Sequence, residues 1–580
     1  MVKKLMSCVR EYKKASLLTP FFVMLEVILE CIIPFITAKL VNELQGGCDL
    51  NVVVKYGLIL LVMAMASLVC GAASGWYCAI ASCGFAKNLR HDLFYKVQGF
   101  SFANIDKFSS SSLVTRLTTD VTNVQNAYMM IIRTAVRTPF MFIFALVMSI
   151  MMSPSLSVTY VFIIPVLAVG LILIMKTTMP IFNSVFKKYD ALNESVQENV
   201  SGIRAVKAYV REDYEIEKFK TASNNLQKDF TKAEKILAFN SPLMQFCMYV
   251  LMMVISYFGA NKIINSGGSD MLVGDLSSLL TYSMQVLMSL MMLSMVFVMV
   301  TMALESMRRI VEVLDDESTI TNPENPLTSV ADGSIDFENV SFAYSQKADK
   351  NVLENVNLHI KAGQTIGIIG GTGSSKTSLI QLIPRLYDVT DGEVRVGGAD
   401  VRDYDLKTLR DEVSVVLQKN VLFSGTIKEN IRWGDENATD EEIERVCKLA
   451  QADEFVQKFP DKYDTYIEQG GSNVSGGQKQ RLCIARALLK KPKILILDDS
   501  TSAVDTKTDA LIRKAFAEEI PDTTKIIIAQ RIASVQEADK IVVLDGGKIN
   551  AVGTHDELLK SNAIYQEVYY SQNKSSEEAG

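Results

Sequence analysis

The chain has few histidines and no closely spaced cysteine pairs. Its three histidines are His91, His359 and His555, and its nine cysteines never form a Cys-x-x-Cys pair. Neither a zinc site nor a disulfide framework is therefore indicated. The formal net charge of −6 gives no sign of nucleic-acid binding. No cleavable signal peptide is evident. The apolar stretch after the basic N-terminus is too long for a signal core and predicts an uncleaved membrane span.

Long apolar runs, in contrast, are abundant. The chain has 580 residues, too many for one core, and 49% of them are hydrophobic. Runs of roughly 20 residues can cross a bilayer. Six such runs fill the first half of the chain, near 17–41, 57–86, 128–152, 156–175, 241–261 and 276–302. We therefore predict six transmembrane helices, because six buried helices of this kind in one soluble domain are improbable.

The charge distribution between these runs predicts their orientation. The segments 87–127 and 176–240 are long and rich in Lys and Arg, whereas 42–56, 153–155 and 262–275 are short and carry few basic residues. The positive-inside rule then places both termini and the two long segments in the cytoplasm.

Several polar or polarisable side chains lie within the predicted spans. Glu26 and Glu30 are four residues apart and share one helix face, and Arg133 and Arg137 repeat this spacing. Intramembrane charges usually face a cavity or a partner. Two interpretations stand: a substrate cavity, or structural Glu–Arg pairing between helices or near the interface.

The last span carries a methionine series that could line a substrate cavity, pack in the core or face lipid: Met284, Met288, Met291, Met292, Met295, Met299 and Met302.

The second half begins after a polar linker, 315–332, that contains Pro323 and Pro326. Short strand patterns then alternate with helical ones, which is typical of an α/β domain. The sequence GGTGSSKT lies between a predicted strand, Thr365 to Ile369, and a predicted helix, Ser378 to Pro384. Backbone N–H groups of such a loop bind phosphates, its lysine adds a charge and its threonine reaches Mg²⁺. The predicted phosphate-binding residues are Gly370, Gly371, Thr372, Gly373, Ser374, Ser375, Lys376, Thr377 and Ser378.

A second phosphate-binding pattern follows downstream. Small residues open a predicted helix over Lys479 to Leu489, and a helix start attracts phosphate. Next comes an apolar strand, Ile494 to Leu497, that ends in Asp498 and Asp499. Carboxylates at the C-terminal edge of a parallel sheet are well placed for a ligand. The residues of the helix start are Ser475, Gly476, Gly477 and Gln478.

Together these motifs resemble the half-transporters of the ABC exporter family, of the multidrug-resistance or lipid-flippase type. In that resemblance VSGGQ is the signature motif, Asp498 is the Walker B aspartate, and Ser502 to Asp505 form the D-loop. It covers about residues 15–570. It implies a type IV exporter-like transmembrane domain of six helices that extend into the cytoplasm, followed by an α/β P-loop ATPase domain. The expected division is 1–314, a linker at 315–332, an ATPase domain at 333–570 and a disordered tail at 571–580.

The resemblance also assigns roles to single positions. Tyr344 matches the tyrosine that stacks on adenine, and Gln418 matches the Q-loop glutamine that reaches the metal, so that Thr377, Gln418 and Asp498 would hold Mg²⁺. Glu468 matches an acidic residue that lies against a coupling helix. The amphipathic pieces Ser112 to Val121 and Gly202 to Tyr209 match the coupling helices, although the residue pattern alone also fits a solvated surface helix.

Three positions depart from the family pattern. Ser375 replaces the glycine before the P-loop lysine, which brings a Cβ where the backbone approaches the ligand. Asp499 replaces the glutamate that polarises the attacking water. Its shorter side chain withdraws the carboxylate, and a misplacement of ~1 Å can cost ~100-fold in rate. Gln530, in IIIAQR, replaces the switch histidine.

The last two departures resemble the degenerate-site subunit of a heterodimeric ABC exporter. The prediction is a plasma-membrane, multi-pass subunit that binds ATP and Mg²⁺ and hydrolyses ATP weakly by itself. It would donate its signature motif to a second half-transporter that carries Glu and His. Expected partners are that subunit, membrane lipids and an amphipathic small-molecule substrate, with no nucleic acid. The alternatives are a lipid or peptide exporter, an importer with the same fold, or an ABC-type regulator that transports nothing; no peptidase-like domain precedes the first span, which weakens peptide processing.

Overall fold

The computed structural model describes residues 1–345, 350–499 and 504–577. It divides into two compact units. The helical unit comprises 1–98 and 110–316, and the ATPase unit comprises 99–109 and 317–580. The boundary between Asp316 and Glu317 lies at the start of the polar linker that the sequence predicted.

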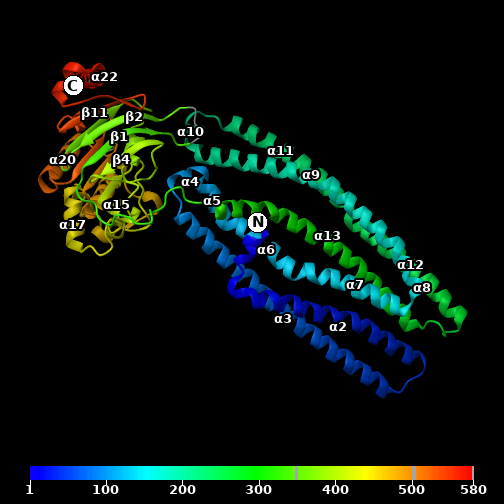
Figure 1. Cartoon of the computed structure of the whole chain (residues 1–580). Helices are drawn as coiled ribbons and strands as arrows, with labels where there is room; N and C mark the ends of the chain where they lie inside the picture. The colour runs from blue at the N-terminus through cyan, green and yellow to red at the C-terminus, as the bar shows by residue number, and fades with distance from the viewer. Residues whose placement is uncertain (346–349, 500–503, 578–580) are drawn as a thin grey trace. The chain divides into compact units, whose positions relative to one another are not determined.

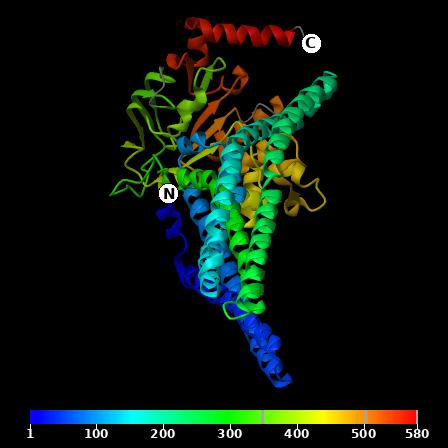
Figure 2. The ribbon, with the colours of Figure 1, turned by 90° about the vertical axis from the view of Figure 1, so that its right-hand side faces the viewer.

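The helical unit consists of long helices (Figures 1 and 2). In the described residues six segments are long and apolar enough to cross a membrane: Arg10–Gln45, Leu50–Gln98, Ser110–Met152, Pro154–Phe182, Glu212–Ser266 and Val273–Asp315. The predicted count of six is confirmed. The main helices are α2 (Lys13–Gln45), α3 (Leu50–Gln98), α6 (Val121–Ile132), α7 (Thr134–Met152), α9 (Thr159–Ser201), α11 (Glu212–Leu237), α12 (Asn240–Ser266) and α13 (Val273–Asp315).

Buried hydroxyl groups connect these helices. Tyr282 of α13 is fully buried and donates to the carbonyl of Cys31 in α2, at 2.6 Å. The hydroxyl of Tyr160 in α9 lies 3.1 Å from Ser149 of α7 and 2.8 Å from Ser283 of α13. A polar group in an apolar helix bundle needs a partner inside the bundle, so each bond fixes the register of the helices it joins.

Three of the four intramembrane charges, Glu26, Glu30 and Arg137, form one cluster on α2 and α7. Arg137 donates from Nη1 to Glu26 at 2.6 Å and from Nη2 to both carboxylate oxygens of Glu30, at 2.7 and 2.8 Å. Gly71 of α3 faces the cluster, since a Cβ there would lie 3.0 Å from Oε1 of Glu26. The Arg133 guanidinium lies beside Gly75, also on α3. Of the two interpretations of these charges, pairing between helices is therefore realised for Arg137.

The predicted coupling segment Ser112 to Val121 lies in the helical unit. It spans α5 (Ser110–Thr115) and a π-helical turn, η2 (Arg116–Asp120). Asp120 is fully buried; it accepts from Nε of Arg309 at 2.9 Å and from the Ser306 hydroxyl at 2.8 Å, both on α13. Asp120 is thus held inside the helical unit, and the docking of this segment on an ATPase domain stays a prediction.

A different short helix, α4 (Phe102–Lys107), belongs to the ATPase unit. A capping box between Ser101 and Asn104 closes its N-terminus. Asn104 donates to the Glu317 carbonyl at 2.9 Å, and the Ser101 hydroxyl lies 2.8 Å from that of Thr319. These polar contacts attach the loop after α3 to the start of the ATPase domain.

The ATPase unit is built on two larger sheets. The main sheet has six strands in the order β12-β11-β3-β10-β9-β6, all parallel except β12. Their bounds are β3 (Thr365–Gly370), β6 (Val413–Val416), β9 (Ile494–Asp498), β10 (Thr524–Ile528), β11 (Lys540–Asp545) and β12 (Lys548–Gly553). The antiparallel sheet β2-β1-β4-β5 comprises β1 (Ile335–Phe342), β2 (Leu353–Ile360), β4 (Asp391–Val396) and β5 (Ala399–Asp400). A short pair joins β7 (Gly425–Thr426) and β8 (Tyr466–Ile467).

Helices complete the ATPase unit: α14 (Lys376–Gln381), α15 (Leu406–Glu412), α16 (Ile427–Ile431), α17 (Asp440–Leu449), α18 (Asp453–Val456), α19 (Gly476–Leu489), α20 (Thr506–Glu519), α21 (His555–Ser561) and α22 (Ala563–Glu577). The strand β9 is buried along its whole length, as its apolar run predicts. The helix α22 continues through Glu577, so most of the tail predicted to be disordered from residue 571 is helical (Figure 2).

Candidate ATP-binding site

The order of the central strands determines which loops meet. The strand β10 pairs with β3 on one side and with β9 on the other, all parallel. Loops that follow parallel strands gather at one sheet edge. The segment after β10 therefore lies between the phosphate loop after β3 and the two aspartates at the end of β9. Lys376, Asp498 and Gln530 are brought together in this way.

The phosphate loop connects β3 to α14 and folds around its lysine. Lys376 donates from Nζ to the carbonyls of Gly370 at 2.8 Å and Gly371 at 2.9 Å. Burial lowers the pKa of Lys376, and Asp498 and Asp499 oppose that effect. At Gly370 a Cβ would lie 2.3 Å from the Leu544 carbonyl of β11, so only glycine fits there. The loop thus places an ammonium group where phosphate oxygens can replace its carbonyl partners.

Ser375 stands immediately before α14 in a left-handed conformation, with φ of 71°. This explains the family's preference for glycine, because a side chain in this region costs roughly 1–2 kcal/mol. The structure accommodates the serine without altering the strand–loop–helix path, and Leu379 N–H still donates to the Ser375 carbonyl at 3.1 Å.

Thr377 and Asp498 form a pair of oxygen donors. The Thr377 hydroxyl lies 3.0 and 3.2 Å from the two carboxylate oxygens of Asp498. Burial raises the pKa of Asp498, and the Thr377 hydrogen bond and Lys376 oppose the shift. Hydroxyl and carboxylate oxygens suit Mg²⁺, which is usually held by few protein ligands together with phosphates. The residues present therefore fit a magnesium ion carried by a nucleotide.

Asp499 and Gln530 interact directly. Gln530 donates from Nε2 to Oδ2 of Asp499 at 2.8 Å. Asp499 is 9% exposed, has φ of 47°, and donates its backbone N–H to the Ile528 carbonyl at 3.0 Å. The two side chains that replace the family's Glu and His are thus joined to each other beside the P-loop lysine.

The signature residues form the N-terminus of α19. The helix begins at Gly476, three residues before the predicted start, because Ser475 and Gln478 form a capping box. The Ser475 hydroxyl accepts from Gln478 N–H at 3.3 Å, and the Gln478 side chain accepts from Ser475 N–H at 2.9 Å. Gln480, which the sequence did not single out, donates to the Asp499 carbonyl at 3.4 Å. It therefore connects the signature helix to the end of β9.

Tyr344 is half exposed, and its hydroxyl lies 2.7 Å from that of Ser378 in α14. Its ring meets Tyr387 edge-on, with 5.2 Å between centroids. Tyr387 in turn donates to Asp106 of α4 at 2.5 Å. Burial, with Asp106 as a further cause, raises the pKa of Tyr387, so it stays a neutral donor at physiological pH. This aromatic pair was not predicted, because its members are 43 residues apart in sequence and meet only in the fold.

The remaining predicted positions are more dispersed. Gln418 is exposed just after β6, at the same sheet edge as the phosphate loop. Glu468 is exposed and accepts from the Ser472 hydroxyl at 2.6 Å. In the D-loop, Asp505 caps α20 by accepting from Thr508 N–H at 3.0 Å, while Ser502 lies outside the described residues.

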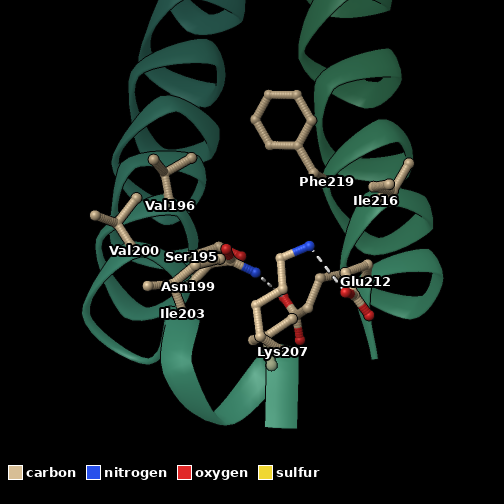
Figure 3. A pocket seen from close by; sticks show the side chains of 11 residues that line it. Ser195, Val196, Asn199, Val200, Ile203, Lys207, Glu212, Ile216 and Phe219 are labelled. Atoms are coloured by element: carbon tan, nitrogen blue, oxygen red, sulfur yellow. Dashed lines mark hydrogen bonds and ion pairs between the residues drawn. The ribbon is translucent and has the colours of Figure 1, made fainter. Parts of the chain in front are cut away.

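An apolar hollow of 370 Å³ is found in the helical unit (Figure 3). It is formed between α9 and α11 beside α10 (Ile203–Ala208), with Val196 and Phe219 on its two sides. The ion pair of Lys207 with Glu212, at 2.9 Å, lies at one end. The predicted amphipathic piece Gly202 to Tyr209 contributes part of its lining, and no ATP-motif residue does.

Comparisons with known proteins agree with this two-part architecture. Residues 16–290 match the ABC transporter transmembrane region, and residues 353–502 match the family described as ABC transporter. A solved bacterial Atm1-family ABC exporter with ATP bound has the same fold, with a TM-score of 0.82 and 22% identity over 97% of this chain and 98% of that one. The type IV exporter fold is thereby confirmed.

Curated relatives align over nearly the whole chain. The ABC transporter ATP-binding protein YfiB of Bacillus subtilis (strain 168) is 36% identical, over 98% of both chains. The protein MT1311 of Mycobacterium tuberculosis (strain CDC 1551 / Oshkosh) is 32% identical over 99% of this chain and 98% of its own. YfiC, also of Bacillus subtilis (strain 168), is 31% identical over 98% of this chain and 94% of its own. The chain therefore belongs to the ABC transporter family, as a half-transporter that joins one transmembrane region to one ATPase domain in the exporter fold.

Proposed function

We propose that this chain is the degenerate-site subunit of a heterodimeric, ATP-driven exporter of amphipathic compounds in the plasma membrane. Its ATPase domain and both termini would lie in the cytoplasm. The observation that carries the proposal is the Asp499–Gln530 pair, at 2.8 Å, where family members that hydrolyse ATP efficiently have glutamate and histidine.

The chemistry of this pair favours binding over cleavage. Asp499 is one methylene shorter than glutamate, and its carboxylate already accepts from the Gln530 amide. Gln530 is neutral and cannot bring the positive charge that a protonated histidine offers the γ-phosphate. The binding residues, apart from Ser375, in contrast match the family: Lys376 would hold the phosphates, and Thr377, Asp498 and Gln418 would hold Mg²⁺.

The signature helix supplies the second half of the proposal. ABC sites form between two chains, so the residues Ser475 to Gln478 would complete the site of a partner that carries Glu and His. The position of these residues at the start of α19 supports this role, because the partial positive charge of a helix N-terminus favours an anion. Two relatives from one Bacillus subtilis strain, YfiB and YfiC, both align with nearly all of this chain, so one genome can supply two half-transporters of this kind.

In this proposal the substrate would pass through the helical unit. Met288 and Met295 on α13 are both more than half exposed in this chain, which suits a flexible apolar wall. Glu26, Glu30, Arg133 and Arg137 would give that path its polar section. The partly exposed side chains of Arg137 and Glu30 support this, while the buried Glu26 anchors the cluster.

The deciding experiment compares the chain alone with the chain co-expressed with a half-transporter from a neighbouring reading frame that carries Glu and His. In lipid nanodiscs the lone chain should bind ATP and turn it over ~100-fold more slowly than the pair, consistent with misplaced catalytic groups. Lys376→Ala in the lone chain gives the background. Equal turnover by both preparations would falsify the degenerate-site assignment.

Transport is tested separately in proteoliposomes that contain the pair. ATP-dependent redistribution of amphipathic dyes supports a multidrug-type exporter, and movement of labelled phospholipid alone supports a lipid exporter. An ATPase-active pair that moves neither dyes, lipids nor peptides in either direction would instead support the non-transporting regulator.

A further inference from the structure

The last helix contacts the loop that carries Gln530. Gln572 of α22 donates from Nε2 to the Gln530 carbonyl at 2.7 Å, and its Oε1 accepts from Ile532 N–H at 2.9 Å. One side-chain amide thus uses its donor and its acceptor on two backbone groups that flank Arg531. A two-point contact of this kind fixes the position and the orientation of the backbone between them.

The loop held in this way leads directly to the candidate site. Gln530 lies two residues beyond the end of β10, the strand between the phosphate loop and the aspartates of β9. Its side chain donates to Asp499 at 2.8 Å. A continuous series of hydrogen bonds therefore runs from α22 through the Gln530 backbone and side chain to the carboxylate next to Asp498.

The helix α22 is itself fixed to the ATPase unit. Tyr565 is fully buried in the core cluster that also contains Ile532, and its hydroxyl lies 2.7 Å from Nδ1 of His555. Tyr565 N–H donates to the Asn562 side chain at 2.9 Å, which caps the start of the helix. Gln572 therefore projects from a preorganised element, so the loop is held by the body of the domain.

We propose that Gln572 is a positioning residue for ATP cleavage: by holding the backbone at residues 530–532, it fixes where the Gln530 side chain meets Asp499. Gln572 does not touch the nucleotide in this role. The C-terminal helix α22 then contributes to ATP cleavage by positioning the loop after β10. Its removal would disorder the site without removing a residue that binds the nucleotide. Gln572 acts in this way on the chain's own site, whichever subunit hydrolyses ATP faster.

The test uses the full-length chain in nanodiscs, in excess over radiolabelled ATP, so that slow single-turnover cleavage is measured at this site. Gln572→Ala should lower the cleavage rate about fivefold or more and leave ATP affinity within twofold, because binding groups are untouched. The matched control is Gln566→Ala on the same helix, whose side chain bonds locally, to the Leu559 carbonyl at 2.8 Å. It should cleave at the wild-type rate. Gln572→Glu, which keeps the acceptor for Ile532 but loses the donor, should fall between.

A double-substitution cycle separates positioning from general stability. In a Gln530→Ala background there is no side chain left to position, so adding Gln572→Ala should change the rate by less than twofold. A fivefold effect that persists in that background would overturn the proposal, as would equal rates for Gln572→Ala and Gln566→Ala. A wild-type chain that cleaves no ATP under single-turnover conditions would also overturn it.

Discussion

At the scale of single residues, the phosphate loop holds a serine in a backbone conformation that suits glycine. We expect Ser375→Gly to stabilise the ATPase domain by about 1 kcal/mol and to tighten ATP binding, because relief of the left-handed strain outweighs the entropy that glycine loses. Thermal unfolding and nucleotide titration measure the two effects. Ser375→Ala removes the hydroxyl and keeps the Cβ, so it should behave like the wild type. If both substitutions act alike, the backbone strain is not the cause.

A second prediction at this scale concerns the contribution of Arg137 to stability. Replacing it by alanine leaves Glu26 and Glu30 without their shared cation in a low-dielectric environment, which should cost about 3–5 kcal/mol of stability. Removing all three charges together, with Glu26→Gln, Glu30→Gln and Arg137→Met, should restore most of the loss. Thermal unfolding in nanodiscs is the measurement. Wild-type stability of the Arg137→Ala chain would show that the cluster does not brace α2 and α7.

At the scale of elements, the short helix α4 depends on contacts with the ATPase domain. Tyr387→Phe removes the hydroxyl bond to Asp106 and keeps the aromatic contacts, so amide hydrogen exchange across Phe102–Lys107 should become severalfold faster. Tyr404→Phe removes another buried hydroxyl bond, to the Val396 carbonyl, without touching α4. It should leave that exchange unchanged. Equal exchange in both variants would assign the attachment of α4 to its cap at Ser101 and Asn104.

The elements also show what the sequence can and cannot predict. The phosphate loop and β9 follow from local patterns, a glycine-rich turn between strand and helix and a fully apolar strand. The early start of α19 was readable in principle, since Ser475 and Gln478 have the spacing of a capping box. The assignment of α4 to the ATPase unit could not be predicted from the sequence, because it rests on hydrogen-bond partners more than 200 residues away. The role of Gln572 was not predictable either, because its partners lie 42 and 40 residues away in sequence and its own polar segment has a composition that predicts disorder.

At the scale of the whole transporter, the proposed asymmetry predicts opposite outcomes for two motifs of this one chain. In the assembled pair, Ser475→Ala should lower steady-state ATP turnover at least tenfold, because the signature serves the partner's competent site. Lys376→Ala should lower turnover far less, because it disables only the slow site. Thr439→Ala, which removes a similar cap from α17, controls for the loss of helix stability. Steady-state ATPase assays that rank Lys376→Ala as the more damaging change would reverse the assignment of the two sites.

The same asymmetry predicts a gain of activity. Asp499→Glu together with Gln530→His should raise hydrolysis in the assembled pair, because both groups nearest the γ-phosphate then match those of efficient family members. Single-turnover cleavage at this chain's site is the direct measurement. No change would mean that other groups, such as Ser375, limit the site.

The length of α3 has a mechanical consequence. Its 49 residues span ~74 Å at ~1.5 Å per residue, against a hydrocarbon layer of ~30 Å, so more than half of the rod lies outside the layer. A tilt of ~10° about its midpoint would sweep each tip through roughly 6 Å, more than one helical turn. A small tilt of α3 within the bilayer therefore displaces its far end by about the length of a side chain.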